Sequence, residues 1–225
     1  MDGLLELLAR YDVLAAFFMT IRLALASAVG SLLIGTVVVV CRVSPVAVLQ
    51  RFGAGYVTVF RNTPLTLILA LCMLGLNYIL GIQIDRENLY SNSFWWAVVG
   101  LSFYHASFVA EALRSGINTV PAGQAEAARS IGLSFLPTLR YVVLPQAFRG
   151  AIAPLGNTMI ALTKNTTVAA TIGVAEAAFV MWNMFEFSPQ HLYATFFIMA
   201  AGFVILTLPL GLLFTWLSNR LVVAR

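Results

Sequence analysis

Residues 126–145 read EAARSIGLSFLPTLRYVVLP and form the longest interruption, rich in polar residues, of an otherwise apolar chain. Two short helices are predicted here. Pro121 suits the first turn of the first helix, because its missing N–H would have no partner there, and Gly132 can end that helix in a left-handed conformation. Pro137 can start the second helix, and Pro145 is expected to end or kink it. The prediction is a helix–turn–helix loop whose small apex residues allow it to lie in a groove of another protein.

The composition indicates an integral membrane protein. Of the 225 residues, 60% are hydrophobic and 10% are charged, and the mean hydropathy is +0.91, whereas soluble domains carry about 25% charged residues. The net charge of +4 is interpreted as a sign of membrane topology, so no nucleic-acid partner is predicted. Cys41 and Cys72 lie in apolar surroundings without metal-ligand spacing, which favours small buried side chains over a metal site.

Five apolar stretches are long enough to cross a hydrocarbon core of about 30 Å, which requires about 20 residues per helix. The predicted fold class is therefore all-α, with a single transmembrane domain over residues 1–225. The spans are predicted at about 13–41, 56–80, 94–115, 151–173 and 192–217, with a cytoplasmic loop at about 116–150. A short interfacial helix is expected before the first span, and Pro209 is expected to kink the last one.

The charged residues predict an orientation in the membrane. With the central loop in the cytoplasm, the basic residues at the inner side are Arg42, Arg51, Arg114, Arg129, Arg140, Arg149, Arg220 and Arg225. Only Arg10 and Arg86 are then outside, and the carboxylates outside are Asp2, Glu6, Asp12, Asp85, Glu87, Glu176 and Glu186. Because cytoplasmic segments carry an excess of Lys and Arg, the N-terminus is predicted outside and the C-terminus in the cytoplasm.

The three remaining basic residues, Arg22, Arg61 and Lys164, all fall within predicted spans. A charge at the centre of a membrane helix costs about 2.5–3.5 kcal/mol on insertion scales, so such groups usually face a cavity or a partner. Arg22 can equally well snorkel, pair with Asp12 or contact another subunit, and Arg61 can snorkel near the cytoplasmic end of its span. Lys164 is about mid-span and has no nearby acid in its own helix, which favours a functional or inter-subunit role.

The spacing of the central loop resembles the signature cytoplasmic loop of binding-protein-dependent ABC importer permeases. That signature is Glu-Ala-Ala, three residues, Gly, nine residues, an aliphatic residue, one residue and Leu-Pro, and the chain matches it with Val142 at the aliphatic position. The alternative is an amphipathic loop between two membrane helices. The resemblance implies the type I ABC importer permease fold, called MetI-like, and a loop that couples to an ATPase. The coupling residues are then predicted to be Glu126, Ala127, Ala128, Arg129, Gly132, Leu133, Leu144 and Pro145.

Two further motifs resemble those of polar-amino-acid permeases. They are RNTPL at residues 61–65, in which Pro64 breaks a helix whose freed backbone groups Asn and Thr can satisfy, and TKNTT at residues 163–167. At Asn165 the family often has Asp, so Lys164 lacks that counter-ion and is left to attract an anion. With residues 108–120, these motifs look most like permease subunits of actinobacterial glutamate uptake systems. The predicted substrate pathway includes Arg22, Arg61, Asn62, Thr63, Lys164, Asn165 and Thr166.

The chain is predicted to be a non-catalytic subunit. A phosphate-binding P-loop needs Gly-Lys-Ser/Thr, but the only lysine, Lys164, follows Thr163. No cofactor is expected on this chain, and ATP and Mg²⁺ are expected on a separate ATPase. The resemblance implies two ATPase subunits, a second, related permease chain and an extracytoplasmic substrate-binding protein, assembled in the plasma membrane of a bacterium and working by alternating access.

A secondary transporter or a channel that works without an ATPase is the alternative function. Secondary transporters commonly have inverted repeats and broken helices near the membrane centre, and no such pairing is apparent in the five stretches. An enzyme would need a cluster of polar groups, but His105 and His191 are far apart and have no acid at metal-ligand spacing. His105 is interpreted as a packed helix residue and His191 as interfacial. The choice between glutamate and another polar amino acid stays open.

Overall fold

The computed structural model describes residues 7–221, and within that range the protein is helical and contains no strand. The predicted all-α fold class is therefore confirmed. The predicted interfacial helix lies partly outside the described residues. Within the described range, residues 7–10 are helical. The predicted positions of Asp2, Glu6 and Arg225 also lie outside the described residues.

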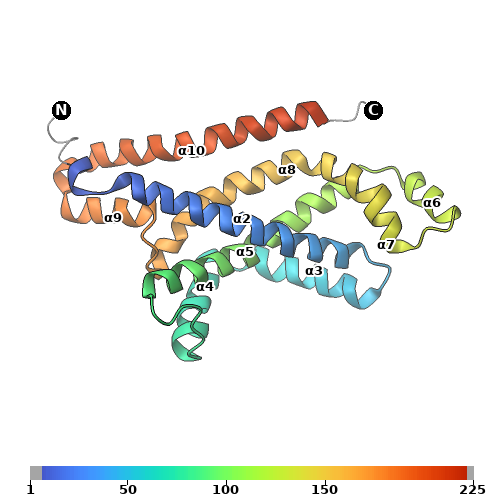
Figure 1. Ribbon diagram of the computed structural model, residues 1–225, viewed down its shortest axis with the longest axis horizontal. Helices are drawn as coiled ribbons and strands as arrows, with labels where there is room; N and C mark the ends of the chain where they lie inside the picture. Colours follow the sequence, from blue (N-terminus) through green and yellow to red (C-terminus); the bar gives the residue numbers. More distant parts are fainter. Residues whose placement is uncertain (1–6, 222–225) are drawn as a thin grey trace.

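Three helices are each long and apolar enough to cross a membrane: α2 (Val13–Val43), α5 (Leu89–Ile117) and α10 (Leu192–Leu221), the last preceded by the short η4 (Pro189–His191). The first, third and fifth predicted spans fall inside α2, α5 and α10. All three helices run broadly along the long axis of the molecule (Figure 1). Pro209 lies inside α10, and the helix continues through it.

The second predicted span, 56–80, is not a single helix. α3 (Ala47–Asn62) begins in a segment that was predicted as a loop. After a turn of 102° the chain continues as α4 (Leu65–Ala70) and the π-helical η1 (Leu71–Ile79). The start of α3 was missed because polar and small residues interrupt its apolar ones. Gly53, on its buried side, presses against α2, where an added Cβ would lie 2.6 Å from Cγ of Arg42.

The fourth predicted span is part of a longer, bent segment. This segment runs through α7 (Phe135–Thr138), the π-helical η2 (Leu139–Val143), α8 (Leu144–Asn165) and the 3₁₀-helical η3 (Thr166–Ile172). It then turns by 56° into α9 (Ala177–Phe187). By length and composition, the described residues therefore supply three membrane-spanning helices, or up to five if each bent pair forms one span.

The centre of the core is α5, which packs against both α2 and α8. Small residues bring these backbones together. A Cβ added at Gly35 of α2 would lie 2.7 Å from Cβ of Val109, and one at Gly116 of α5 would lie 2.8 Å from Cβ of Ala151. Close approach at small residues is the usual packing of membrane helices. Together with the fully buried Leu101, these contacts make α5 the scaffold on which the other helices rest.

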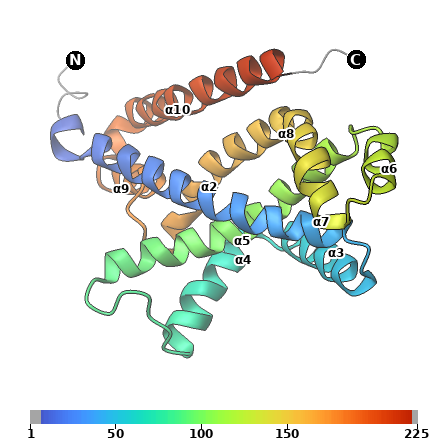
Figure 2. The same ribbon diagram turned by 45° about the vertical axis from the view of Figure 1, so that its right-hand side comes forward.

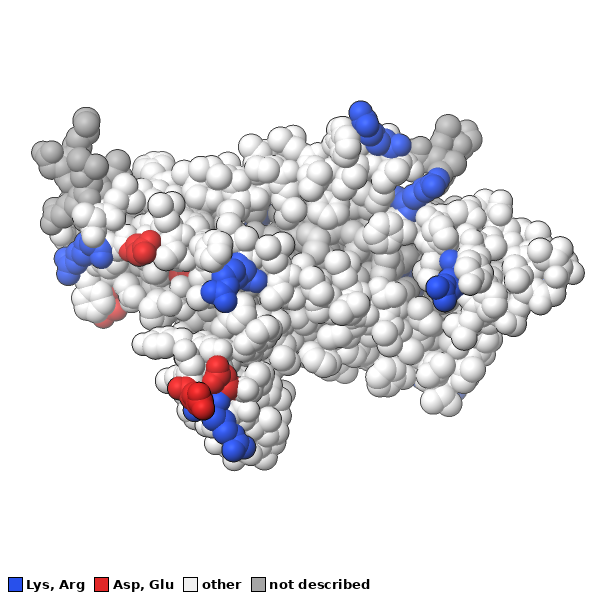
Figure 3. Space-filling view, in the orientation of Figure 1, with Lys and Arg blue, Asp and Glu red and all other residues white. Residues whose placement is uncertain are grey.

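The two ends of the molecule differ in structure and charge. α6 (Ala122–Ser130) and α7 lie at one end and α9 lies at the other, as Figure 1 and Figure 2 both show. On the face drawn in Figure 3, the acidic atoms gather toward the α9 end, whereas only basic side chains appear at the α6 end. α10 packs on α8 and α9, and among its residues only Thr195 and Met199 are buried. Its exposed apolar surface needs lipid or another subunit to cover it.

Candidate functional site

The first half of the central loop is α6, whose end has a well-defined cap. Gly132 adopts φ +92°, which confirms the predicted left-handed stop. Its N–H donates to the Arg129 carbonyl at 3.0 Å, and the N–H of Leu133 donates to the Ala128 carbonyl at 3.1 Å. These two bonds form a Schellman motif. Pro121 precedes the first turn as N-cap residue instead of lying within it.

Pro145 was predicted to end or kink the second helix of the loop, and the structure shows that the helix does not end there. α7 passes through η2 directly into α8, and Pro145 lies in the first turn of α8. The physical reason is the π-helical turn, in which the N–H of Leu144 bonds to the Leu139 carbonyl five residues back at the end of η2. This wider turn makes room for a proline ring that would otherwise clash with the preceding carbonyl. The predicted start of a helix near Pro137 is confirmed, since α7 begins at Phe135.

The apex of the loop is exposed and shaped to contact another molecule. In α6 only Ala128 is buried, whereas Glu126 and Arg129 are exposed. Ile131, at the tip, is 80% exposed although it is apolar. Behind the apex, a pocket of about 310 Å³ separates α6 and α7 from the turn between α2 and α3. An exposed apolar residue on a firmly capped helix is typical of a docking surface.

An ion-pair network anchors the helices that lead into this loop. Glu111 of α5 pairs with Arg42 at the end of α2 through one carboxylate oxygen, and with Arg114, 3.1 Å away, through the other. The three side chains are between 19% and 41% exposed. The sequence placed Arg42 and Arg114 at the cytoplasmic side, but nothing in the spacing predicted that Arg42 and Glu111 meet.

The two motifs at residues 61–65 and 163–167 both lie where helices change direction or type. At the first break, the side chains of Asn62 and Thr63 donate to the carbonyls of Thr58 and Val59, both at 2.8 Å. The prediction that these side chains satisfy freed backbone groups is confirmed. At the second, α8 gives way to η3 directly after Asn165.

These two breaks lie close together, because α4, which follows the first, packs directly on η3, which follows the second. Such a pairing of broken helices was not apparent in the sequence, since it depends on contacts between segments about 100 residues apart. Broken helices whose ends meet are a common way to build a binding site inside a membrane.

Side chains of α5 lie between the two breaks and contact both. The guanidinium carbon of Arg61 is 5.3 Å from the ring centroid of Phe108. The Phe108 ring is 6.1 Å from the His105 ring, and Nε2 of His105 lies 3.2 Å from the amide nitrogen of Asn165. The structure thus links Arg61 to Asn165 through two aromatic side chains of one helix.

The two cations of this region have no acidic partner within residues 7–221. Both salt bridges of that range involve Glu111, and neither includes Arg61 or Lys164. Both side chains are exposed in the isolated chain. Lys164 lies in the last turn of α8, directly before the second break, and its position near the middle of a span stays a prediction. The region therefore carries uncompensated positive charge on a surface that the chain leaves open.

Arg22 lies apart from the other predicted pathway residues. Its guanidinium carbon is 5.4 Å from the ring of Phe94, near the start of α5. Phe94 and Phe108 are 14 residues apart on this helix, which corresponds to about 21 Å at 1.5 Å per residue. Pairing of Arg22 with Asp12 is not observed, since the Asp12 carboxylate caps α2 by accepting the N–H of Ala15 at 2.9 Å.

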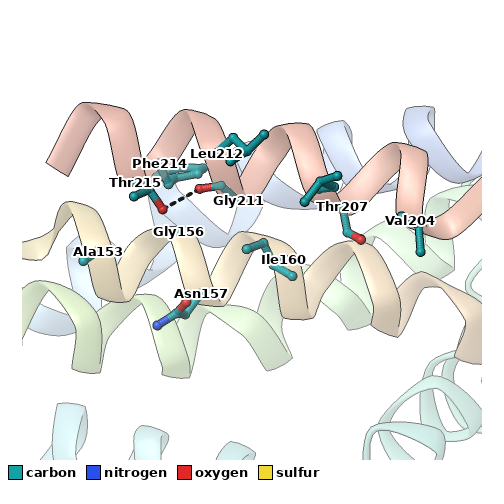
Figure 4. Close-up of a pocket in the computed structure, with 11 residues that line it drawn as sticks. Ala153, Gly156, Asn157, Ile160, Val204, Thr207, Gly211, Leu212, Phe214 and Thr215 are labelled. Carbon is teal, nitrogen blue, oxygen red and sulfur yellow. Dashed lines mark hydrogen bonds between the residues drawn. The ribbon is translucent and has the colours of Figure 1, made fainter. Parts of the chain in front are cut away.

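A pocket of about 460 Å³ lies between α8 and α10 (Figure 4). Gly156 faces Phe214 there, and the Thr215 hydroxyl donates to the Gly211 carbonyl of its own helix at 2.8 Å. Asn157 points away from α10 (Figure 4). It belongs to an exposed stripe of α8 that also contains Ala153, Ala161 and Lys164.

Two buried polar residues had roles that were not predicted. Glu176 is completely buried and caps α9, accepting the N–H groups of Ala178 and Phe179, each at 3.0 Å. Glutamate is not among the common N-cap residues, so this cap could not be predicted from the residue type. His105 is 1% exposed, which confirms that it is a packed helix residue, but its bond to Asn165 was not foreseen.

Comparison with known proteins shows close relatives over nearly the whole chain. Residues 27–223 match the family described as binding-protein-dependent transport system inner membrane component. The glutamate transport system permease protein GluC of Corynebacterium glutamicum is 50% identical, with 95% of this chain and 96% of that protein covered. The probable glutamine ABC transporter permease protein GlnM of Bacillus subtilis is 32% identical, with 91% of each chain covered.

Solved structures show the same fold. A chain in the crystal structure of an amino acid ABC transporter with histidines matches with a TM-score of 0.78 and 27% identity, covering 92% of this chain and 93% of the other. A chain of the inward-facing MetNI methionine ABC transporter matches with a TM-score of 0.71 and 20% identity over 99% of this chain and 100% of the other, which supports the MetI-like fold alone. From the family match and these relatives, the chain belongs to the binding-protein-dependent transport system inner membrane components, the membrane-embedded permease subunits of ABC importers.

Proposed function

We propose that this permease forms half of the translocation pathway of an ATP-driven importer for an acidic amino acid, most specifically glutamate. The main support for glutamate as the substrate is the 50% identity, over 95% of the chain, to a permease named for glutamate transport. The uncompensated charges of Arg61 and Lys164 support it, because a substrate with an extra carboxylate would supply the missing negative charge. The alternative of a carrier or channel without an ATPase is not favoured by the family.

The proposed assembly contains two ATPase subunits, a second, related permease and an extracytoplasmic substrate-binding protein. The exposed apex of α6, with Glu126, Arg129 and Ile131, is the element that docks into the ATPase. ATP and Mg²⁺ are bound by that subunit. The exposed apolar surface of α10 supports contact with lipid or the second permease.

In the proposed orientation, five membrane spans place the α9 end outside and the α6 end in the cytoplasm. The separation of acidic and basic side chains between the two ends, on the face drawn, supports this choice (Figure 3).

Transport then occurs by alternating access. ATP draws the two ATPase subunits together, and each subunit carries a coupling loop with it. α8 and α5 transmit this movement to the two helix breaks. The residues that surround the pathway there are Lys164, Asn62, Thr63, Asn165 and Thr166. Arg22, which is far from the breaks, is proposed to act nearer the outer side.

The test is purification of the complex in mild detergent from native membranes, with identification of the co-purified chains by mass spectrometry. The complex is then reconstituted in liposomes, and its ATPase is measured with binding protein loaded with glutamate, aspartate, glutamine or arginine. Recovery of an ATPase and a second permease, with stimulation strongest for glutamate, is the expected result. Stimulation by arginine or glutamine alone would contradict the acidic substrate. A chain that purifies in high yield without any ATPase would contradict the importer itself.

A further inference from the structure

The imidazole of His105 is held in one tautomer by its two neighbours. Nδ1 lies 3.1 Å from the carbonyl oxygen of Leu101, and Nε2 lies 3.2 Å from the side-chain nitrogen of Asn165. A carbonyl oxygen only accepts, so Nδ1 must carry the proton. In the neutral ring, Nε2 is then the acceptor, and the group that faces it must be the NH₂ of Asn165. The ring is 1% exposed, so water does not compete for this bond.

Asn165 supplies a side-chain hydrogen bond that ties the second break to another helix. The hydroxyls of Thr163, Thr166 and Thr167 all donate to carbonyls three or four residues back in the same segment. Those bonds stabilise the local turn, but they do not fix where it lies relative to α5. Among the side-chain hydrogen bonds of residues 163–167, only that from Asn165 reaches a distant element.

The other side of His105 leads to the first break. The ring centroids of His105 and Phe108 are 6.1 Å apart, and the guanidinium of Arg61 lies over the Phe108 ring. Tyr104 adds a T-shaped contact to His105, with ring centroids 5.1 Å apart. A displacement of the imidazole would therefore move groups at both breaks, whereas an unbonded ring could rotate without affecting Asn165.

We propose that His105 is a positioning residue for transport: its Nε2 holds Asn165 and so fixes the junction of α8 and η3 that presents Lys164 to the pathway. The inference rests on the proposed function, which assigns Lys164 to that pathway. His105 does not touch the substrate. It adds no charge of its own in this tautomer, so the cation of Lys164 remains uncompensated while its backbone is held in place.

The functional test compares two substitutions in the complete transporter, reconstituted in liposomes with loaded binding protein. His105→Gln keeps an acceptor oxygen for Asn165, and His105→Phe fills the space without an acceptor. In His105→Phe, the amount of radiolabelled glutamate imported per ATP hydrolysed should fall about tenfold, the effect of one hydrogen bond of roughly 1.4 kcal/mol. In His105→Gln it should stay within about twofold of the unmodified protein. ATP hydrolysis without binding protein should be unchanged in both.

Two further variants separate this inference from the proposed function. Asn165→Ala should cause a smaller loss when added to His105→Phe than in the unmodified protein, because in His105→Phe the bond is already absent. Equal import by His105→Gln and His105→Phe, with a sensitive Lys164→Ala variant, would overturn the positioning role alone. Normal import by Lys164→Ala would instead remove the pathway role on which the inference rests.

A spectroscopic test examines the bond directly. The chain contains two histidines, so a His191→Gln variant labelled with ¹⁵N-histidine gives imidazole signals from His105 only. The expected spectrum has a protonated Nδ1 and an unprotonated, hydrogen-bonded Nε2, and Asn165→Ala should shift the Nε2 signal. A protonated Nε2, or a Nε2 signal that Asn165→Ala leaves unchanged, would overturn the assignment of this pair.

Discussion

Single residues carry the coupling loop and the pathway, and each acts through a different physical property. Gly132 matters for its backbone: a Cβ added there would meet nothing within 4 Å, but φ is +92°. Lys164 matters for its charge, because it is exposed at the end of α8 with no acidic partner in the described part of the chain. His105 matters for the lone pair on its Nε2, which accepts the hydrogen bond from Asn165. These distinctions determine which substitutions are informative.

Gly132→Asp is expected to abolish uptake while the protein still inserts into the membrane, because it places a negative charge at the apex that is proposed to dock into the ATPase. Gly132→Asn is the matched control, since Asn has similar size, no charge and a high tolerance for left-handed backbone. It should keep most of the uptake. Co-purification of the ATPase and uptake in liposomes measure both effects. Normal uptake by a well-expressed Gly132→Asp protein would show that the apex does not dock.

Lys164→Ala is expected to reduce the transport of an acidic amino acid by tenfold or more, about 1.4 kcal/mol, with little change in assembly. The side chain is exposed and forms no salt bridge among residues 7–221, so its removal leaves no buried partner behind. Lys164→Arg keeps the charge and should retain more activity. The measurement is ATP hydrolysis stimulated by the loaded binding protein, and a value unaffected by Lys164→Ala would mean that the lysine is structural.

Among the helices, α5 contacts both helix breaks and leads into the central loop. Its middle contacts both helix breaks through His105 and Phe108. Its end carries Glu111 and then leads through Ile117 into the coupling loop. Because α5 also packs against α2 and α8, a movement imposed on α6 has a rigid path to the breaks. Rigid elements with few alternative packings transmit displacement better than mobile loops.

Glu111→Gln is expected to loosen the junction of α2, α5 and the coupling loop. The substitution leaves Arg42 and Arg114 close together without a counter-charge, and because the side chains are partly exposed we expect a loss of about 1–2 kcal/mol. The apparent Tm of the purified complex, followed by tryptophan fluorescence, should fall by several degrees. Glu87→Gln is the control for charge, since Glu87 is exposed, lies far from the coupling loop and has no salt bridge within the described range. An equal Tm for both variants would contradict the network.

Elements with a continuous apolar pattern could be predicted from the sequence, and elements that depend on contacts could not. α2, α5 and α10 follow from length and hydropathy, and the stop at Gly132 follows from local chemistry. The start of α3 was missed because helix formation there relies on packing of Gly53 against α2. The π turn that accommodates Pro145 and the His105–Asn165 bond depend on neighbours that no local spacing reveals.

On the scale of the whole molecule, the chain is asymmetric in charge and incomplete in its packing. On the face drawn in Figure 3, only basic side chains appear at the end with α6, and the acidic ones lie toward the end with α9. α10 exposes much of its apolar surface, with 69% of Ile205 and 63% of Leu212 accessible. Such a molecule is suited to a membrane with a fixed orientation and to a partner that covers one of its faces.

The orientation gives the last prediction, which single cysteines can test. In a background with Cys41 and Cys72 replaced by alanine, Arg86→Cys lies in the exposed loop between η1 and α5, and Ile131→Cys lies at the tip of the coupling loop, where the native side chain is 80% exposed. A membrane-impermeant maleimide should label Arg86→Cys in intact spheroplasts and Ile131→Cys only after permeabilisation. Both sites are accessible in the isolated chain, and labelling of permeabilised membranes after removal of the ATPase separates burial under that subunit from the side of the membrane. The reverse pattern would place the coupling loop outside the cell, where no ATP is available, and would contradict both the orientation and the ATP-driven mechanism.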